Sequence, residues 1–449
     1  MSKVYKIKKG LDIKLAGEAE RTLTEFSATH VALKPTDFIG VFPKLLVQEG
    51  DVVKAGDPVF CDKAHPEVLF TSPVHGKVAE IVRGPKRILL EIKIELLTPE
   101  TYTDFGKANP SNLTREEIIS KMLQSGVWPM IRQRPYSVIA NPADKPKAIF
   151  ISGFDTAPLA PDYDFIVHGQ GDVFQTGIDA LKKLTNDKIY LNLPDGMVNS
   201  KVLTNTRGVE INHFSGPHPA GNVGTQIALL CPINKGDVIW YLRPQEVIII
   251  GKLFAEGRYN ARRIIAVCGS EVRKPKYYKV PGGVGIKKLL AGNVNESDVR
   301  FISGNVLTGT RLEPDGYLGF YDSQITVIPE GDYHEFLGWS MPRLHKHSFS
   351  RSYFSWLTPD KHYVADTNLN GGVRALVMTG QFEQVFPFDI YPTQLLKSII
   401  YNDIDEMEKL GIYEVDEEDF ALCEYIDTSK TEIQSIVRQG LNSLRAEMS

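Results

Sequence analysis

The spacing of apolar positions changes several times along the chain, and each change predicts a different kind of element. Between residues 40 and 95, β-branched pairs alternate with Gly-Asp and Pro-x-x-Gly turns, which is typical of short strands. A helix is predicted from Thr114 to Gly126, because Thr-Arg-Glu-Glu fits a capping box and an apolar face follows it. Residues 96–110 are expected to form a linker.

Strand-like and helix-like stretches then alternate to about residue 255. Short apolar runs at 148–151, 165–167, 188–191 and 247–250 predict strands. The apolar periodicity of residues 174–184 predicts a helix. Such alternation favours a layered, Rossmann-like α/β domain.

The rest of the chain combines a small mixed unit with helices. A short helix at 285–290, among strands at 263–268, 299–302 and 323–328, favours a β-grasp unit. The acidic run at 414–419 is expected to be a solvated helix start, which the helix dipole favours. Further helices are predicted at 392–401, 403–410, 416–423 and 429–445.

The segment from Val47 to Val78 resembles the barrel-sandwich hybrid of biotinyl and lipoyl carrier domains. Within it, Asp62-Lys63-Ala64 matches the lipoyl tripeptide, so a carrier lipoylated at Lys63 is one hypothesis. However, Lys63 follows the Gly50-Asp51 turn too closely, and Pro66 interrupts the strand that should come next. A register error moves a side chain off the hairpin tip. We therefore expect the fold without the modification.

These elements predict a multidomain α/β and β protein with four domains. They are a barrel-sandwich hybrid (biotinyl/lipoyl-like) domain at 1–100, a Rossmann-like α/β domain at 101–255, a β-grasp (SLBB-like) domain at 256–330 and a mainly helical domain at 331–449.

Composition narrows the functional classes. The 449 residues are 42% hydrophobic and 24% charged, which is ordinary for a globular protein. A formal net charge of -4 gives no electrostatic reason to expect nucleic acid. No signal peptide is expected, and the longest apolar runs fall far short of the roughly 18 residues of a membrane span. The cysteines lie far apart in sequence, which excludes a local CxxC pattern and fits a reducing, cytoplasmic location.

The candidate motifs for nucleotides and metals are incomplete. His168-Gly-Gln-Gly-Asp172 lacks the third glycine of a dinucleotide loop, and no Walker A motif is present. The pairs His213/His218 and His345/His347 lack partners at metal-ligand spacing. The glycine- and proline-rich loop from His213 to Gly221 is either a structural turn or a functional loop.

Several segments together resemble the A subunit of the bacterial Na+-translocating NADH:quinone oxidoreductase (Na+-NQR), in order and spacing over essentially the whole chain. These segments are 50–78, His218-Pro-Ala-Gly-Asn-Val-Gly-Thr225, 302–309, Val385-Phe-Pro-Phe-Asp-Ile-Tyr-Pro-Thr-Gln-Leu-Leu396 and 417–423.

The resemblance implies one part of a six-subunit respiratory complex in the bacterial inner membrane. Such a complex oxidises NADH, reduces ubiquinone or menaquinone and exports Na+. The resemblance also implies a peripheral subunit on the cytoplasmic face, without a transmembrane segment. Its chief partner would be the flavin-bearing membrane protein of the complex, the B subunit, and it would be linked to quinone binding.

The fold also resembles the NADH-binding flavoprotein subunit of complex I and the C subunit of the Rnf complex, where a glycine-rich loop holds FMN and NADH. At that place this chain has Trp128, Pro129 and Arg132, which do not allow the close backbone approach of glycine. Only Cys423 stands where those relatives carry cluster cysteines, and one thiolate cannot hold a cluster. The chain is therefore expected to bind no redox cofactor or metal and to supply no catalytic residue, with flavins, Fe-S and NADH on other subunits. A stand-alone flavin- or NAD-dependent oxidoreductase is the alternative.

A quinone site is expected beside this altered loop, where aromatic and polar side chains come together. The candidate quinone-binding residues are Trp128, Arg132, Arg134, His213 and His218.

Overall fold

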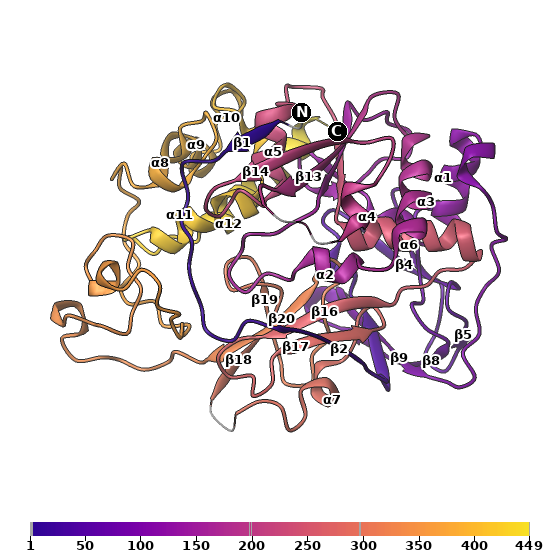
Figure 1. Ribbon diagram of the computed structural model, residues 1–449, viewed down its shortest axis with the longest axis horizontal. Coiled ribbons are helices and arrows are strands. Elements are labelled where there is room, and N and C mark those ends of the chain that lie inside the picture. The colour runs from indigo at the N-terminus through magenta and orange to yellow at the C-terminus, as the bar shows by residue number, and fades with distance from the viewer. Residues whose placement is uncertain (1–2, 197, 199, 296–297, 449) are drawn as a thin grey trace.

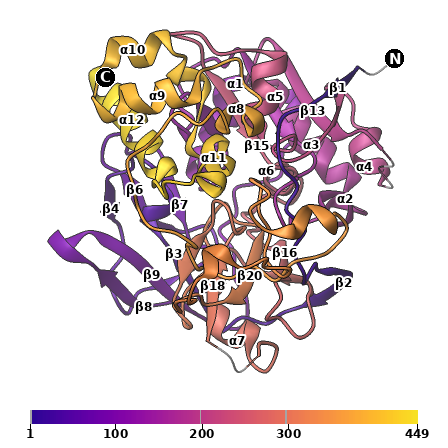
Figure 2. The ribbon, with the colours of Figure 1, turned by 90° about the vertical axis from the view of Figure 1, so that its left-hand side faces the viewer.

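A computed structural model describes residues 3–448, apart from residues 197, 199, 296 and 297. The described chain contains four β-sheets, and helices cluster at its C-terminal end (Figure 1). In the view of Figure 2 these C-terminal helices lie at one end of the molecule and the β-grasp strands at the other.

Two small antiparallel sheets build the first domain, with strand orders β3-β9-β8-β5 and β4-β6-β7. Short strands predicted within residues 40–95 are confirmed, because each glycine- or proline-containing turn ends a short strand. The strands are β3 (His30–Leu33), β4 (Pro43–Leu45), β5 (Val52–Val53), β6 (Pro58–Asp62), β7 (Leu69–Thr71), β8 (Gly76–Arg83) and β9 (Leu89–Leu96).

Two strands of the N-terminal stretch pair outside these two sheets. Strand β1 (Val4–Lys6) pairs in parallel with β14 of the α/β sheet, and β2 (Glu20–Glu25) pairs in parallel with β17 of the β-grasp sheet. The indigo stretch between them runs along the outside of the molecule (Figure 1). Pairing with a distant strand edge leaves no local sequence pattern, so sequence reasoning missed it.

The α/β domain contains a seven-stranded sheet of order β1-β14-β13-β12-β15-β10-β11. Strands β1, β14, β13, β12 and β15 run in parallel, and β10 and β11 form an antiparallel hairpin at one edge. The strands are β10 (Arg132–Arg134), β11 (Val138–Ile139), β12 (Ala148–Ser152), β13 (Lys188–Pro194), β14 (Glu210–Ser215) and β15 (Ile239–Leu242).

The helices of this domain include two segments that were predicted as strands. The apolar run 165–167 lies in α2 (Tyr163–Val167), and the run 247–250 lies in α6 (Pro244–Glu256). A continuous apolar run fits a helix that is buried all round as well as a strand. The end signals of α6, Pro244 at its first turn and left-handed Gly257 after its last, are those of a helix.

The other helices agree better with the prediction. Helix α1 has the predicted capping box between Thr114 and Glu117. The remaining helices are α1 (Arg115–Gln124), α3 (Gly171–Lys182), α4 (Lys201–Thr204) and α5 (Val223–Leu230).

A six-stranded sheet of order β19-β18-β20-β16-β17-β2 and one helix form the β-grasp domain, as predicted. Its elements are β16 (Arg263–Cys268), β17 (Lys276–Val280), α7 (Ile286–Leu290), β18 (Val299–Ser303), β19 (Thr310–Leu312) and β20 (Gln324–Pro329).

The last part of the chain becomes helical only from Phe382. The only helical turns in residues 331–381 are two short 3-10 turns, at Gly338–Ser340 and Phe354–Leu357. The helices are α8 (Phe382–Val385), α9 (Pro392–Ile400), α10 (Ile404–Lys409), α11 (Ala421–Ile426) and α12 (Ile433–Met448).

The two faces of the seven-stranded sheet are covered differently. Phe150 and Tyr241 belong to an apolar cluster that also contains Phe386, Leu396 and other residues of the C-terminal helices. The opposite face belongs to a second cluster, which includes side chains of α3, α6 and the first domain. The C-terminal helices are therefore part of the core of the α/β domain.

Candidate functional site

The β10–β11 hairpin is the place where the parts of the chain meet. It extends from β15 at the sheet edge toward the C-terminal helices, and Tyr321 of the β-grasp domain also reaches it through its hydroxyl group, which donates to Pro129 O at 2.7 Å. Three of the predicted site residues, Trp128, Arg132 and Arg134, lie in or just before this hairpin. We call the β10–β11 hairpin, together with Trp128 and Tyr321 beside it, the hairpin junction.

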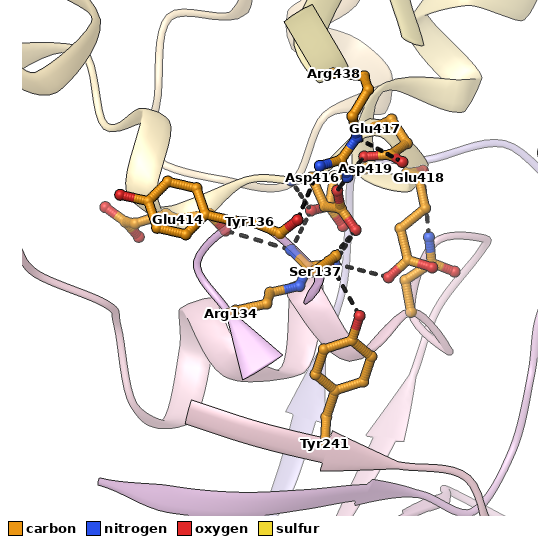
Figure 3. A network of polar contacts seen from close by, with 11 residues as sticks. Arg134, Tyr136, Ser137, Tyr241, Glu414, Asp416, Glu417, Glu418, Asp419 and Arg438 are labelled. Carbon is orange, nitrogen blue, oxygen red and sulfur yellow. Dashed lines mark hydrogen bonds and ion pairs between the residues drawn. The ribbon is translucent and has the colours of Figure 1, made fainter. Parts of the chain in front are cut away.

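Arg134 is fully buried and holds the C-terminal helices to the hairpin (Figure 3). Its Nη1 lies 2.5 Å from Asp419 Oδ2 and its Nη2 lies 2.7 Å from Glu418 Oε1. Asp416 Oδ2 is 3.8 Å from Nη2. One guanidinium thus contacts three carboxylates of the run 416–419.

A second arginine completes the carboxylate cluster from α12. Arg438 Nη2 lies 2.7 Å from Asp416 Oδ1, and its Nε donates to Glu417 Oε1 at 3.0 Å. Ser137 donates to Asp416 and accepts a hydrogen bond of 3.0 Å from the Tyr241 hydroxyl group. Figure 3 shows these groups converging from the hairpin, the sheet and the C-terminal helices.

The four carboxyl groups outnumber the two guanidiniums, and their pKa values separate accordingly. Burial and the neighbouring Asp416 raise the pKa of Glu417 to about 9, although Arg438 opposes this. Burial raises the pKa of Asp419 to about 7 against the pull of Arg134. Burial also opposes ionisation of Asp416, but a hydrogen bond from Glu417 and both guanidiniums hold its pKa well below its usual range. The pKa of Glu417 is therefore shifted upward and that of Asp416 downward, although Arg438 donates to both carboxylate oxygens of Glu417.

The carboxylate cluster corrects the expectation of a solvated helix start at 414–419. Asp416 caps the 3-10 turn Glu417–Phe420, and Asp416 and Asp419 are almost completely buried. An acidic run in a sequence gives no sign of the arginines that face it, which here come from positions 134 and 438. Sequence reasoning therefore named Arg134 but missed its partners.

Arg132 lies in a different environment on the same strand. Its guanidinium carbon is 4.6 Å from the centre of the Tyr241 ring and 4.4 Å from the centre of the Tyr321 ring. Cation–π stacking of this kind holds a guanidinium without using its N–H groups. Within the described part of the chain, these N–H groups make no hydrogen bond or ion pair. Half-buried Arg132 thus has donors available to a ligand.

Trp128 faces the core instead. It is 0% exposed, its indole N–H donates to Ala140 O at 2.7 Å, and its ring lies edge-on to Trp240 at 5.5 Å. The structure therefore separates Trp128 from Arg132 and Arg134, although the three are close in sequence.

The two histidines lie at the far side of the parallel sheet. His213 is in β14, with Nδ1 3.1 Å from Pro194 O. His218 is buried with Nδ1 3.1 Å from Thr156 Oγ1, and burial lowers its pKa. The loop after His218 leads to the carboxylate cluster, because a Cβ at Gly224 would lie 2.3 Å from Asp419 Oδ1 and 2.6 Å from Arg134 Nη1. Only a glycine at position 224 allows this approach.

Lys63 lies in the connection between β6 and β7 but not at its apex, which agrees with the expectation drawn from its spacing. Strands β6 and β7 pair through Cys61 and Leu69, and residues 63–67 between them are exposed. Pro66 lies within this longer connection and does not interrupt a strand. Lys63 is the first residue of the connection, not its apex, and its backbone N–H is bound to Phe42 O at 2.8 Å.

The remaining candidate motifs provide no complete site. Residues 168–170 join helices α2 and α3, so no strand precedes this motif as it does in a dinucleotide-binding loop. Among the described residues, no three histidine, cysteine or acidic side chains form a group that could hold a metal ion. In the same part of the chain, no helix has the length and hydrophobicity that crossing a membrane requires.

Comparisons with family models match three parts of the chain. The model described as the NqrA N-terminal barrel-sandwich hybrid domain matches residues 5–97. The NqrA second alpha/beta domain matches residues 113–259, and the NQRA C-terminal domain matches residues 264–313.

Curated relatives match over the full length. The A subunit of the Na(+)-translocating NADH-quinone reductase of Yersinia pestis biovar Antiqua is 39% identical over 448 residues, which are 99% of this chain and 100% of the relative. The same subunit of Neisseria meningitidis serogroup B is 39% identical over 450 residues, with the same coverage of both chains. That of Rhodopirellula baltica is 36% identical over 457 residues, covering 99% of this chain and 98% of the relative.

Proposed function

The chain belongs to the NqrA family, the A subunit of the Na(+)-translocating NADH-quinone reductase, and on this premise we propose that it works as one part of such a respiratory complex. In this role it supports electron transfer from NADH to ubiquinone or menaquinone, coupled to Na+ export. The observation that carries the proposal is 39% identity over the whole length of both chains. The chain takes part in an oxidoreductase reaction without being catalytic alone.

The proposed location is the cytoplasmic face of the bacterial inner membrane, with the flavin-bearing B subunit as chief partner. Sodium translocation requires a membrane-spanning pathway, and no described helix of this chain could supply one. Residues 331–381 support docking, because this irregular segment exposes large apolar side chains such as Phe336 at 90% and Val373 at 77%.

Flavins, Fe-S centres and NADH are proposed to lie on other subunits, and an absorption spectrum tests this. The purified chain is expected to show no visible absorption. A flavin band at near-stoichiometric amount would favour the alternative, a stand-alone flavin- or NAD-dependent oxidoreductase. That alternative has no support in the full-length relatives, which are all named as one part of the complex.

We further propose that Arg132 is the residue that meets a quinone carbonyl oxygen. Its guanidinium is held between Tyr241 and Tyr321 and keeps free donors, whereas Arg134 is occupied by carboxylates. Arg134 lies on the same strand as Arg132, whereas Trp128 faces the core and His213 and His218 lie at the far side of the sheet.

Replacing Arg132 by Met is expected to weaken binding of a short-chain ubiquinone at least about tenfold, because a hydrogen bond from a charged donor is lost. Isothermal titration of the full chain measures the change. Arg262→Met is the matched control, because Arg262 is an exposed arginine with only a 3.4 Å contact to Glu100. Unchanged quinone affinity in a folded Arg132→Met variant would contradict the assignment.

A further inference from the structure

A cleft of about 330 Å³ opens where the first domain, the β10–β11 hairpin and the end of α12 meet. This volume lies at the lower end of the range of small-molecule sites, which favour junctions between domains. The walls are apolar and polar in nearly equal parts, and Tyr136 contributes a phenol ring. They include Ile39, Val41, Val68, Tyr136, Val138 and Ile139.

Two hydrogen-bond donors in the cleft are unused. Arg445, near the end of α12, makes no ion pair or hydrogen bond within the described part of the chain. The Tyr136 hydroxyl group likewise has no partner among the described residues. Both side chains line the cleft, and they lie near enough to each other that the positive charge of Arg445 opposes the rise in the pKa of Tyr136 that burial causes. Tyr136 is therefore a neutral donor at pH 7, beside a permanent cation.

The first domain makes room for this arginine. A Cβ at Gly40 would lie 1.9 Å from Arg445 Nη1, so the guanidinium lies directly against this turn. A half-buried guanidinium needs an anionic partner, because removing it from water is costly. No described residue of the cleft is an anionic partner of Arg445, so a bound ligand can take that place.

The acidic residues of the cleft have other roles. The Asp62 carboxylate accepts hydrogen bonds from the backbone N–H groups of Phe42 and Ala64, each at 3.1 Å. Asp144 accepts a hydrogen bond of 3.4 Å from Asn141, and burial raises its pKa. Asp62 and Asp144 line the cleft with Arg445, but in the described part of the chain neither forms an ion pair with it.

We propose that this cleft binds a small monocarboxylate with an apolar body of one or two aromatic rings. Its carboxylate lies on Arg445 and Tyr136, since a guanidinium matches a carboxylate with two parallel hydrogen bonds. Its rings lie between the valine and isoleucine side chains and against Tyr136. This site is separate from Arg132, whose guanidinium lies between Tyr241 and Tyr321.

Isothermal titration of the full chain with 2-naphthoate tests the proposal. We expect saturable binding at one site, and binding of the neutral analogue 2-naphthylmethanol that is at least about tenfold weaker. Arg445→Gln is expected to weaken naphthoate binding by a similar factor. Tyr136→Phe, which removes only the hydroxyl group, is expected to weaken it by about two- to tenfold. Arg207→Gln is the matched control, because Arg207 is exposed and lies outside the cleft.

Three results would overturn the proposal. They are no saturable binding of naphthoate, equal affinity for the neutral analogue, and unchanged affinity in both cleft variants. If Arg445→Gln does not fold, Tyr136→Phe decides alone, because its ring keeps its contacts.

Discussion

Replacing Arg134 by Ala is expected to lower the free energy of unfolding by about 3–5 kcal/mol, the usual cost of removing one partner of a buried ion pair. Arg134 is 0% exposed and contacts Asp416, Glu418 and Asp419. Without it, these carboxylates remain buried beside Arg438 alone. Urea unfolding followed by circular dichroism measures the loss.

Arg262→Ala is the control for this measurement. Arg262 forms a 3.4 Å ion pair with Glu100, and the two side chains are 43% and 37% exposed. Exposed pairs contribute at most about 1 kcal/mol, so this variant should unfold almost like the wild type. Equal stability of Arg134→Ala and the wild type would show that Arg134 does not hold the C-terminal helices to the hairpin.

Raising the pH from 5.5 to 8.5 is expected to destabilise the carboxylate cluster. The pKa of Glu417 is raised from 4.5 to about 9 and that of Asp419 from 3.8 to about 7. A carboxyl group whose pKa is higher in the folded state binds its proton more tightly there. Such a group stabilises the fold fully when the pH is below its pKa in the unfolded chain. This stabilisation is lost as the pH rises through its pKa in the folded chain. The lowered pKa of Asp416 affects the free energy of unfolding only below this pH range.

Where the folded state binds one proton more than the unfolded state, the free energy of unfolding falls by up to about 1.4 kcal/mol for each unit of rising pH. The Glu417 side chain is 28% exposed, so solvent screening reduces its share. Glu417→Gln keeps a donor for Asp416 and removes one titrating group, so the decline between pH 5.5 and 8.5 should become shallower. Glu80→Gln, an exposed pair with Lys93, should leave the decline unchanged. Parallel pH profiles for wild type and Glu417→Gln would contradict the raised pKa of Glu417.

Local signals predicted much of the fold. The capping box at Thr114 and the glycine turns at Gly50 and Gly56 act within a few residues, and their predicted elements are present. Apolar runs were ambiguous where burial is complete, as in α6, because a run buried on all sides lacks a helical or strand period. The pairing of β1 and β2 with distant strands depends on tertiary contacts that no local pattern encodes.

The candidate site was predictable only in part, for a related reason. The departure from a glycine-rich loop pointed to Arg132 and Arg134, which do lie at the hairpin junction. The sequence spacing of Arg132 and Arg134, two residues apart on one strand, did not show that their environments differ. Asp416 and Arg438 are far from Arg134 in sequence, and only the docking of the C-terminal helices brings them to it.

We propose that this chain works as a cofactor-free subunit of the Na(+)-translocating NADH-quinone reductase. Affinity purification of the tagged chain from the membranes of its own cells, with identification of partners by mass spectrometry, tests it most directly. The prediction is that membrane-embedded sibling subunits co-purify with NADH-dependent quinone reductase activity, and that the chain separated from them is colourless. Recovery of the chain alone, carrying its own flavin and its own activity, would contradict the claim.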